Sequence, residues 1–560
     1  MVNKLVQYAG NTLIRWQLRW VWLTTVRKLL KATKHPLQMQ QDLLIAITVA
    51  NRDTTFGQHH NFGEISSYAD YCQHVPVSEY ESLRPYIEAE IERDEKSLTA
   101  EVPVTYVRTS GTSGLPKDIP LILSHLISLK RIHRMAVANQ YRLCPEAFTG
   151  SILAITSPAT EGQFSNGKRY GSASGVVSQS TAAVVRKKFV LPDTVLTVSN
   201  SRIKYLLILR LALSKADITH IACANPSTLL TLIELYRKHS NELITSVAIG
   251  GFFLKEQVPQ SVWTSIAQQL VPQPKRAAQL RALHQQTSPV RLIDLWPQLR
   301  LVVTWTCASA GVAARSLKNE LPSPVLVLEL GYLASEFRGT ISLGRRADSG
   351  MPTFDTHFFE FVERDLWDNG APLFLTLAQV RKGVDYYVIV TTPSGLYRYF
   401  MNDLVRVTGF FNQIPLLKFL QKGKGVTNIT GEKLYESQVI TAIHAAMKGI
   451  TAARFIMTLA DEDARFYRIY IETANANNPA TNGVAALIDS KLAEINMEYS
   501  SKRESARLAP PALKWLQPGT EEAYKKFCVE RGQREGQFKT VSLTYAKNFQ
   551  FDLEAFSVKG

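Results

Sequence analysis

The chain has 560 residues, 45% of them hydrophobic and 20% charged. This composition is that of an ordinary globular protein, excludes a disordered or fibrous one, and at this length predicts roughly two to four domains. The formal net charge of +16 favours anionic partners, which include nucleotides, acidic small molecules, nucleic acid and membrane surfaces, but does not choose among them.

The N-terminal segment is basic and amphipathic. Residues 1–34 hold seven Lys or Arg residues, and the first acidic residue of the chain is Asp42. Apolar side chains recur in it at helical spacing, at Leu13, Trp16, Trp20, Leu23 and Val26. Two interpretations stay open. Residues 1–34 form a helix in weak contact with a membrane surface, or a helix whose apolar face packs on the body of the protein, which is the commoner arrangement.

Hydropathy and cysteine spacing bear on the compartment of the protein. No stretch reaches the roughly 18 uninterrupted apolar residues that a membrane span needs. Arg15, Arg19 and Arg27 interrupt the apolar runs of residues 1–30, so this segment also lacks the pattern of a secretory signal. The five cysteines lie far apart without a Cys-x-x-Cys pair, which argues against a disulfide framework or a zinc site. We therefore expect a cytoplasmic protein.

The middle of the chain alternates strand-like and helical segments, which predicts an α/β fold class. Predicted strands cover residues 102–109, 151–157, 243–249, 299–305 and 325–330, and predicted helices cover residues 203–214 and 226–238. After Pro352, strand-like runs at residues 357–363, 384–392 and 404–411 predict an added β-rich portion.

A change of pattern near residue 422 predicts a domain boundary. Residues 421–425, Gln-Lys-Gly-Lys-Gly, are polar and show no apolar period, so we expect a hinge there. Beyond it, a helix, strand, helix series at residues 436–447, 454–473 and 484–499 predicts a small α+β domain. We therefore predict a large N-terminal domain over residues 1–422 and a small C-terminal domain over residues 423–560.

The most informative segment follows the first predicted strand. It contains two glycines, four hydroxyl residues and a lysine in nine positions: Thr109, Ser110, Gly111, Thr112, Ser113, Gly114, Leu115, Pro116 and Lys117. Glycines let backbone N–H groups surround an anion, hydroxyls donate to phosphate oxygens, and Lys117 could add a positive charge. The spacing is not that of the P-loop NTPases. Composition alone does not separate a nucleotide site from a solvated turn.

The full string, continued by Asp118-Ile119-Pro120, resembles the phosphate loop of the adenylate-forming superfamily, in its branch of auxin-responsive acyl-acid amido synthetases. Further segments are similar to that family in the order it requires, over roughly residues 40–440. They are Asn51-Arg52-Asp53-Thr54-Thr55-Phe56-Gly57, Gly331-Tyr332-Leu333-Ala334-Ser335-Glu336, Phe358-Phe359-Glu360-Phe361 and the stretch from Leu396 to Val407. The resemblance implies an adenylate-forming N-terminal domain with a mobile C-terminal domain.

The resemblance also implies a function and a set of site residues. The expected enzyme activates a carboxylic acid with ATP and Mg²⁺ as an acyl-adenylate, then passes the acyl group to an amine or amino acid. Tyr332 offers a flat face for adenine, Glu336 could hold Mg²⁺, and Asp403 could accept both ribose hydroxyls. Ser335 and Arg406 belong to the same nucleotide-binding motifs. The alternatives are a core tyrosine, a surface ion pair of Glu336, and pairing of Asp403 with Arg398 or Arg406.

Three lysines are candidates for catalysis. Lys117 belongs to the loop, and the resemblance implies that rotation of the C-terminal domain brings Lys433 to the phosphates in one state. Lys539 lies in a near-terminal segment similar to one of the family. Three departures matter. Asn402 replaces the family's glycine before Asp403, although Asn tolerates left-handed geometry, and Phe337 replaces a glycine and would narrow the acyl pocket. Gln421-Lys422-Gly423-Lys424 replaces the family's usual Gly-Arg-Lys-like hinge.

Two other functions stay open. A thiol, on coenzyme A or a carrier protein, could replace the amine as acceptor. Alternatively, the chain is a catalytically silent, basic binding module for nucleic acid or anionic lipid, although it shows no nucleic-acid-binding motif. The expected partners are therefore a small carboxylic acid and an amine, with no nucleic acid, and we expect a monomer.

Overall fold

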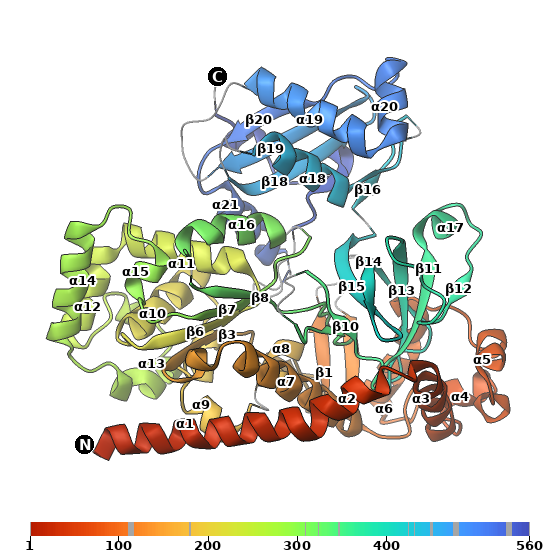
Figure 1. Ribbon diagram of the computed structural model, residues 1–560, viewed down its shortest axis with the longest axis horizontal. Coiled ribbons are helices and arrows are strands. Elements are labelled where there is room, and N and C mark those ends of the chain that lie inside the picture. Colours follow the sequence, from red (N-terminus) through yellow and green to blue (C-terminus); the bar gives the residue numbers. More distant parts are fainter. Residues whose placement is uncertain are drawn as a thin grey trace.

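A computed structural model describes residues 2–109, 117–178, 181–308, 310–322, 324–344, 348–423, 425–430, 432–448, 452–473, 481–531, 533 and 540–558, with side chains from residue 10 on except those of residues 481 and 482. In Figure 1 the parallel sheet and the helices around it form the left half of the molecule, and a β-rich portion forms the right half. The C-terminal domain lies above both. The first helix runs along the edge of the molecule opposite the C-terminal domain.

The parallel sheet forms one half of the N-terminal domain. Its strands, in spatial order, are β3 (Ser151–Ile155), β6 (Ile218–Cys223), β7 (Leu301–Thr304) and β8 (Leu326–Glu329). They are short, nearly continuous apolar runs, as expected where helices cover both faces of a sheet. The neighbouring helices are α7 (Leu123–Leu143), α8 (Ala173–Ser178), α9 (Ala183–Arg186), α10 (Ser201–Leu213), α11 (Pro226–Lys238), α12 (Ser240–Ile249), α13 (Gln260–Ile266), α14 (Pro274–Gln286), α15 (Leu292–Leu295) and α16 (Ala310–Glu320).

The predicted strand at residues 243–249 is wrong, because these residues belong to helix α12. Leu243, Ile244 and Val247 are buried, and their spacing suits one face of a helix as well as a strand. A seven-residue apolar run does not distinguish the two structures. The central strand β6 was not predicted.

The β-rich portion forms the other half of this domain. Its antiparallel sheet has the spatial order β12 (Phe374–Leu375), β11 (Phe358–Glu363), β13 (Asp385–Thr391), β14 (Tyr399–Phe411) and β15 (Ile414–Lys422), with helix α17 (Arg364–Asp368) after β11. A second sheet has the order β2 (Lys117–Ile122), β1 (Pro103–Thr109), β5 (Arg169–Gly171) and β4 (Gly162–Gln163). A short pair, β9 (Thr340–Ile341) and β10 (Met351–Pro352), lies between the two halves.

The N-terminal helices pack beneath both halves. They are α1 (Val2–Val21), a π-helical turn (Trp22–Val26), α2 (Arg27–Ala32), α3 (Pro36–Ala50), α4 (Thr55–His59), α5 (Tyr68–His74) and α6 (Tyr80–Arg93). Most of the predicted apolar face does not pack on the body: Leu13, Trp16, Trp20 and Leu23 are exposed and only Val26 of that set is buried, whereas Ile14, Leu18 and Val21 are buried instead. The helix carries two apolar stripes, and the smaller side chains of Ile14, Leu18 and Val21 pack on the body.

The C-terminal domain is a mixed sheet with helices. Its strands have the order β20 (Ala512–Leu516), β19 (Phe466–Thr473), β18 (Ala453–Asp461) and β21 (Leu543–Tyr545), and its helices are α18 (Glu436–Ala446), α19 (Thr481–Ile495), α20 (Met497–Glu504) and α21 (Thr520–Glu530). The single strand predicted at residues 454–473 is the hairpin β18–β19. Twenty residues are too long for an ordinary strand.

The junction between the domains begins at the end of β15. Gln421 and Lys422, expected in the hinge, are the last residues of this strand, and the short strands β16 (Val426–Thr427) and β17 (Leu434–Tyr435) follow. The C-terminal domain contacts the parallel-sheet half: Ser316 Oγ donates to the carbonyl of Ala453 at 3.0 Å. Among the described helices, none is long and apolar enough to cross a bilayer.

Candidate active site

A cavity of about 700 Å³ opens where the two halves of the N-terminal domain meet the C-terminal domain. Its walls come from β2, α7, β3, residues 335–338 and the end of β15, with Thr540 and Val541 from the C-terminal domain. A smaller hollow of about 80 Å³ shares Trp305, Leu333 and Phe419 with this cavity, so the two adjoin. Gly331 and Tyr332 line the smaller hollow.

The predicted phosphate loop begins and ends at the cavity. Ser110, Gly111, Thr112, Ser113 and Gly114 lie outside the described residues. Thr109, the last residue of β1, and Lys117, the first of β2, pair with each other in an antiparallel ladder, and both line the cavity.

The Lys117 side chain sits among charged and aromatic neighbours. Its ammonium lies 5.4 Å from the centre of the Tyr80 ring. Burial lowers the pKa of Lys117, while the Glu336 carboxylate acts in the opposite direction. Ser335 and Glu336 line the same cavity, so the structure brings these three predicted site residues together.

Tyr332 and Asp403 form the centre of a buried polar cluster. The Tyr332 hydroxyl donates to Asp403 Oδ2 at 2.6 Å, and Lys422 Nζ lies 3.1 Å from Asp403 Oδ1. Asp403 is only 1% exposed and does not line either cavity. Burial by itself lowers the pKa of Lys422. The negative charges of Asp403 and, next, Glu336 together have the larger effect, so this pKa is raised. The side chains of Tyr332, Asp403 and Lys422 therefore form one cluster, in which the charge of Asp403 stabilises the charged form of Lys422.

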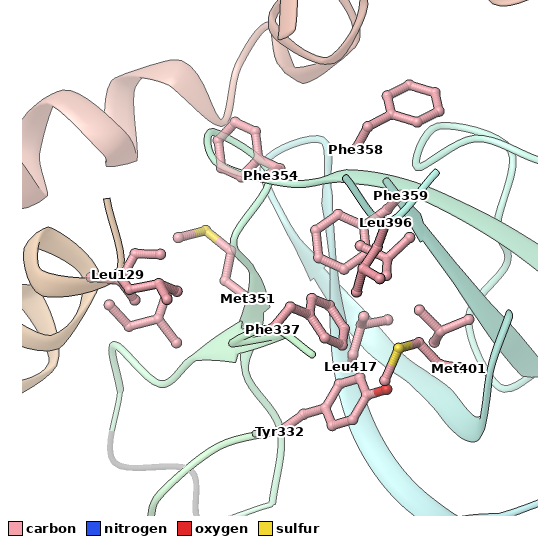
Figure 2. Close-up of a cluster of buried hydrophobic side chains, with 14 of the residues drawn as sticks. Leu129, Tyr332, Phe337, Met351, Phe354, Phe358, Phe359, Leu396, Met401 and Leu417 are labelled. Atoms are coloured by element: carbon pink, nitrogen blue, oxygen red, sulfur yellow. The ribbon is translucent and has the colours of Figure 1, made fainter. Parts of the chain in front are cut away.

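Aromatic packing fixes the position of the Tyr332 ring. It stacks on Phe419, with ring centres 5.4 Å apart and planes 19° from parallel, and Phe337 meets it edge-on at 5.3 Å. Figure 2 shows the ring of Phe337 between those of Tyr332 and Phe359. Phe337 is 2% exposed, so most of its bulk fills the core behind Tyr332.

Asn402, which precedes Asp403, adopts the left-handed conformation with a φ of 51°. Its carbonyl accepts a hydrogen bond from the backbone N–H of Gly423 at 2.7 Å. A Cβ on Gly423 would lie 1.9 Å from Asn402 Oδ1, so these two residues pack closely. Asn tolerates this conformation better than most residues, which explains how it stands where the similar family has glycine.

The two arginines considered as partners of Asp403 have other partners. Arg398 forms a fully buried ion pair with Glu360, at 2.9 Å. Arg406 pairs with Asp385 through contacts of 2.6 and 2.9 Å, and it lines neither cavity. The structure therefore does not bring the predicted nucleotide-binding residue Arg406 to the site. It lies three residues after Asp403 on β14, and successive side chains of a strand alternate between the faces of its sheet.

The two candidate lysines of the C-terminal domain differ in position. Lys433 donates to Asn369 Oδ1 at 3.4 Å and lines neither cavity. Lys539 lies outside the described residues, whereas Thr540, Val541 and Ser542, which follow it, line the cavities.

Comparison with known proteins decides the family. Residues 25–324 match the GH3 family N-terminal domain, residues 350–422 the GH3 family central domain, and residues 437–548 the GH3 family C-terminal domain. The chain belongs to the GH3 family. This confirms the family predicted from the motifs.

Individual relatives match this GH3 protein over most of their length. Indole-3-acetic acid-amido synthetase GH3.15 of Arabidopsis thaliana is 24% identical over 552 residues, covering 91% of this chain and 90% of that protein. The 4-substituted benzoates-glutamate ligase GH3.12 of Arabidopsis thaliana is 22% identical over 550 residues, covering 92% of this chain and 94% of that protein. The solved structure of GH3.15 acyl acid amido synthetase has a TM-score of 0.84 at 22% identity, covering 95% of this chain and 96% of that one. This likeness confirms the α/β fold with its smaller C-terminal domain.

The sequence did not single out Lys422 as a site residue of this GH3 protein. The sequence around Lys422 gives little indication of a site, because this lysine lies in a polar, glycine-containing stretch that resembles a hinge. Its partner in the β14–β15 ladder is Asp403, and only this register brings the lysine to the carboxylate. Glu436 also lines the cavity: it is 3% exposed and accepts the Ser542 N–H at 2.6 Å, and burial raises its pKa to about 7.

Proposed function

We propose that this GH3 protein is an ATP-dependent ligase that activates a carboxylic acid as its acyl-adenylate and transfers the acyl group to the amine of an amino acid. The observation that carries this proposal is the convergence of Lys117, Glu336 and Lys422 on one cavity, beside the Tyr332–Asp403 pair. The relatives named as an indole-3-acetic acid-amido synthetase and a benzoates-glutamate ligase support it, since both names describe amide formation from an acid.

The residues present fit a nucleotide. Asp403 Oδ1 is buried and has no hydrogen-bond partner of good geometry among the described residues, although Lys422 lies beside it. The adjoining hollow is lined by the flat side chains of Tyr332, Trp305 and Phe419. We propose that adenine occupies this hollow and that Asp403 accepts the ribose hydroxyls, with the Tyr332 hydroxyl giving way and Lys422 remaining beside the carboxylate.

A divalent cation fits beside Glu336. Mg²⁺ prefers few protein carboxylates and takes its other oxygens from phosphate and water, and Glu336 is a half-buried carboxylate on the cavity wall. When bound, the ion would neutralise phosphate charge and polarise the phosphorus–oxygen bonds.

The protein's own contribution to the first half-reaction is positioning and electrostatics. The substrate carboxylate attacks the α-phosphorus of ATP, forming a new P–O bond while the bond to pyrophosphate breaks. Lys117 and Lys422 place fixed positive charge at the cavity wall, where it stabilises the negative charge of the phosphates without reorganisation during the reaction. In the second half-reaction a neutral amine attacks the acyl carbonyl, AMP leaves, and the amine's proton passes to solvent.

The larger cavity supports a proposal for the acid. Leu129, Phe148 and Ile152 make part of its wall apolar, which suits the hydrocarbon body of an acyl group. Arg338 also lines it, and Arg338 Nε has no hydrogen-bond partner among the described residues. His133 nearby is neutral, because burial and then Arg338 lower its pKa to about 3. We propose that the substrate is an apolar carboxylic acid with one polar substituent, and that this substituent binds to Arg338.

The position of the C-terminal domain supports the proposed two-state cycle. Residues 540–542, directly after Lys539, lie at the cavity, while Lys433 is turned towards Asn369. We propose that this arrangement serves adenylation with Lys539, and that rotation about a hinge at the 422/423 boundary brings Lys433 in for acyl transfer. The hinge glycine, Gly423, directly follows Lys422.

Product analysis tests the proposal against the thiol alternative. The purified protein would be incubated with ATP, Mg²⁺, a panel of carboxylic acids and either amino acids or coenzyme A, and the products identified by mass spectrometry. An amide with AMP supports the proposal, and a thioester in place of the amide would assign the acceptor to the thiol class.

The proposed compartment is the cytoplasm, where five free cysteines stay reduced.

A further inference from the structure

The first helix presents an unpaired apolar stripe to solvent. Leu13, Trp16, Trp20 and Leu23 are 61%, 69%, 65% and 52% exposed. Leu13, Trp16 and Trp20 belong to α1, where about 100° per residue places them within an arc of roughly 60°, and Leu23 lies in the π-helical turn that follows. Two exposed tryptophans and two exposed leucines on one line form a continuous apolar strip, which soluble surfaces normally avoid.

The same helix is held firmly by its opposite face. Ile14, Leu18 and Val21 are at most 7% exposed, and α1 packs against α7 and α9. Asn11 Nδ2 also donates to the carbonyl of Thr149 at 3.3 Å. The exposed stripe is therefore a fixed feature of the folded body rather than the core face of an undocked helix.

Positive charge borders the apolar stripe. Arg15 and Arg19 are exposed on the flank between the buried and the exposed stripes, and no ion pair engages either of them within the described part of the chain. Further exposed basic residues follow at Arg27, Lys28, Lys31 and Lys34. The sequence contains no acidic residue before Asp42, so nothing on this segment offsets the charge.

We propose that residues 13–34 form a docking surface for an anionic phospholipid bilayer. Tryptophan prefers the boundary between lipid headgroups and acyl chains, and an amphipathic helix with basic flanks lies in that plane with its apolar side down. Anionic headgroups complement the basic flank. A second copy of the chain fits this surface poorly, because two such helices would bring like charges together.

The geometry leaves the enzyme free to work while docked. Figure 1 shows α1 along the base of the molecule and the C-terminal domain at the opposite edge. Helix α7 lies between, contacting α1 on one side and lining the cavity with Leu129, His133 and Ala136 on another. Docking through α1 therefore places the cavity above the bilayer and leaves the junction after Lys422 unobstructed.

Vesicle cosedimentation tests the proposal. The full chain would be mixed with vesicles of phosphatidylcholine alone or of phosphatidylcholine with phosphatidylglycerol, at about 0.1 M and about 1 M salt. Compared variants are Trp16→Ser/Trp20→Ser, Arg15→Gln/Arg19→Gln, and the control Ile249→Ser, whose residue is 68% exposed on another surface. All replaced side chains are exposed, so the thermal midpoint and the pyrophosphate exchange should stay unchanged.

The wild type and the control should bind the anionic vesicles, with binding reduced about tenfold by high salt and by each double substitution. Equal binding to both vesicle types, no binding to either, or binding unaffected by the double substitutions would each overturn the proposal. A dimer in light scattering that the tryptophan substitutions abolish would also overturn it and assign the stripe to a second copy.

Discussion

Lys422 Nζ lies 3.1 Å from Oδ1 of Asp403, so the last residue of β15 is tied to the carboxylate that we propose for ribose binding. Asp403 is almost fully buried, whereas the Lys422 side chain keeps 38% of its surface exposed towards the cavity. The next residue, Gly423, packs on Asn402. Through these contacts the nucleotide site and the domain junction share one short segment of chain.

Removal of the Lys422 charge should damage the first half-reaction. In Lys422→Met, Asp403 keeps a buried charge without its cation, so we expect a loss of about 1–2 kcal/mol in stability and about 100-fold in ATP–pyrophosphate exchange. Lys418→Met is the matched control, since Lys418 is on the same strand and pairs with the exposed Asp348. It should change the exchange rate less than twofold. Equal rates for both variants would contradict the assigned role of Lys422.

The close approach of Gly423 and Asn402 predicts a coupled pair of substitutions. Gly423→Ala should destabilise the wild type by about 1–3 kcal/mol, because its Cβ would meet Asn402 Oδ1 at 1.9 Å. Asn402→Gly removes that atom and suits the φ of 51°, so the double variant should recover most of the loss. The check is the thermal midpoint of all four proteins. Additive effects would mean that the two residues do not compete for this space.

The ion pairs of Arg398, which directly precedes β14, and of Arg406, within β14, should differ strongly in their contributions to stability. Glu360→Gln leaves Arg398 buried without its carboxylate and should cost about 3–5 kcal/mol. Arg406→Gln breaks a pair in which the arginine is 48% exposed, and should cost at most about 1 kcal/mol. Chemical denaturation measures both. Pyrophosphate exchange by Arg406→Gln should equal that of the wild type, and a large loss would place Arg406 in the nucleotide site.

The buried carboxyl of Glu436 predicts a pH-dependent stability. Burial raises its pKa from an ordinary value near 4.5 to about 7, so the folded state disfavours the ionised form. Its favourable contribution is complete below about pH 4.5 and is lost as the pH rises through about 7, an effect on the order of 3 kcal/mol. Glu436→Gln removes this titration while keeping an oxygen to accept the Ser542 N–H. The variant should therefore be more stable than the wild type at pH 8 but not at pH 5. Parallel profiles of thermal midpoint against pH would refute this.

The motifs alone predicted the family, and they also supplied candidate site residues, several of which the structure brings to the same two cavities. Lys117 begins β2, and Tyr332, Ser335 and Glu336 lie in the segment between β8 and β9, so local motifs in two short stretches supplied all four cavity residues. Lys422 could not be predicted, since its place depends on the register between β14 and β15. Arg406 failed to reach the site for a related reason, because strand alternation turns it towards Asp385.

Short apolar segments were the least predictable part of the fold. Residues 243–249 fit a strand and a helix equally by pattern, and it is the tertiary structure, in which α12 packs against α10, α11 and α14, that shows the helix. Helix α1 shows the same limit. Its sequence holds two apolar stripes, and only the tertiary structure shows that Ile14 and Leu18 are buried while Trp16 and Trp20 are exposed.

The central claim is acid activation by adenylation, and ATP–pyrophosphate exchange tests it most directly. Purified protein with Mg²⁺ would be assayed across aromatic, aliphatic and hydroxy carboxylic acids, beside the near-isosteric variant Asp403→Asn. We predict exchange that requires a particular acid and falls by about 100-fold or more in the variant, because the amide has no charge to hold Lys422 and accepts fewer ribose hydrogen bonds. Absence of exchange with every acid, together with no detectable ATP binding, would contradict the account.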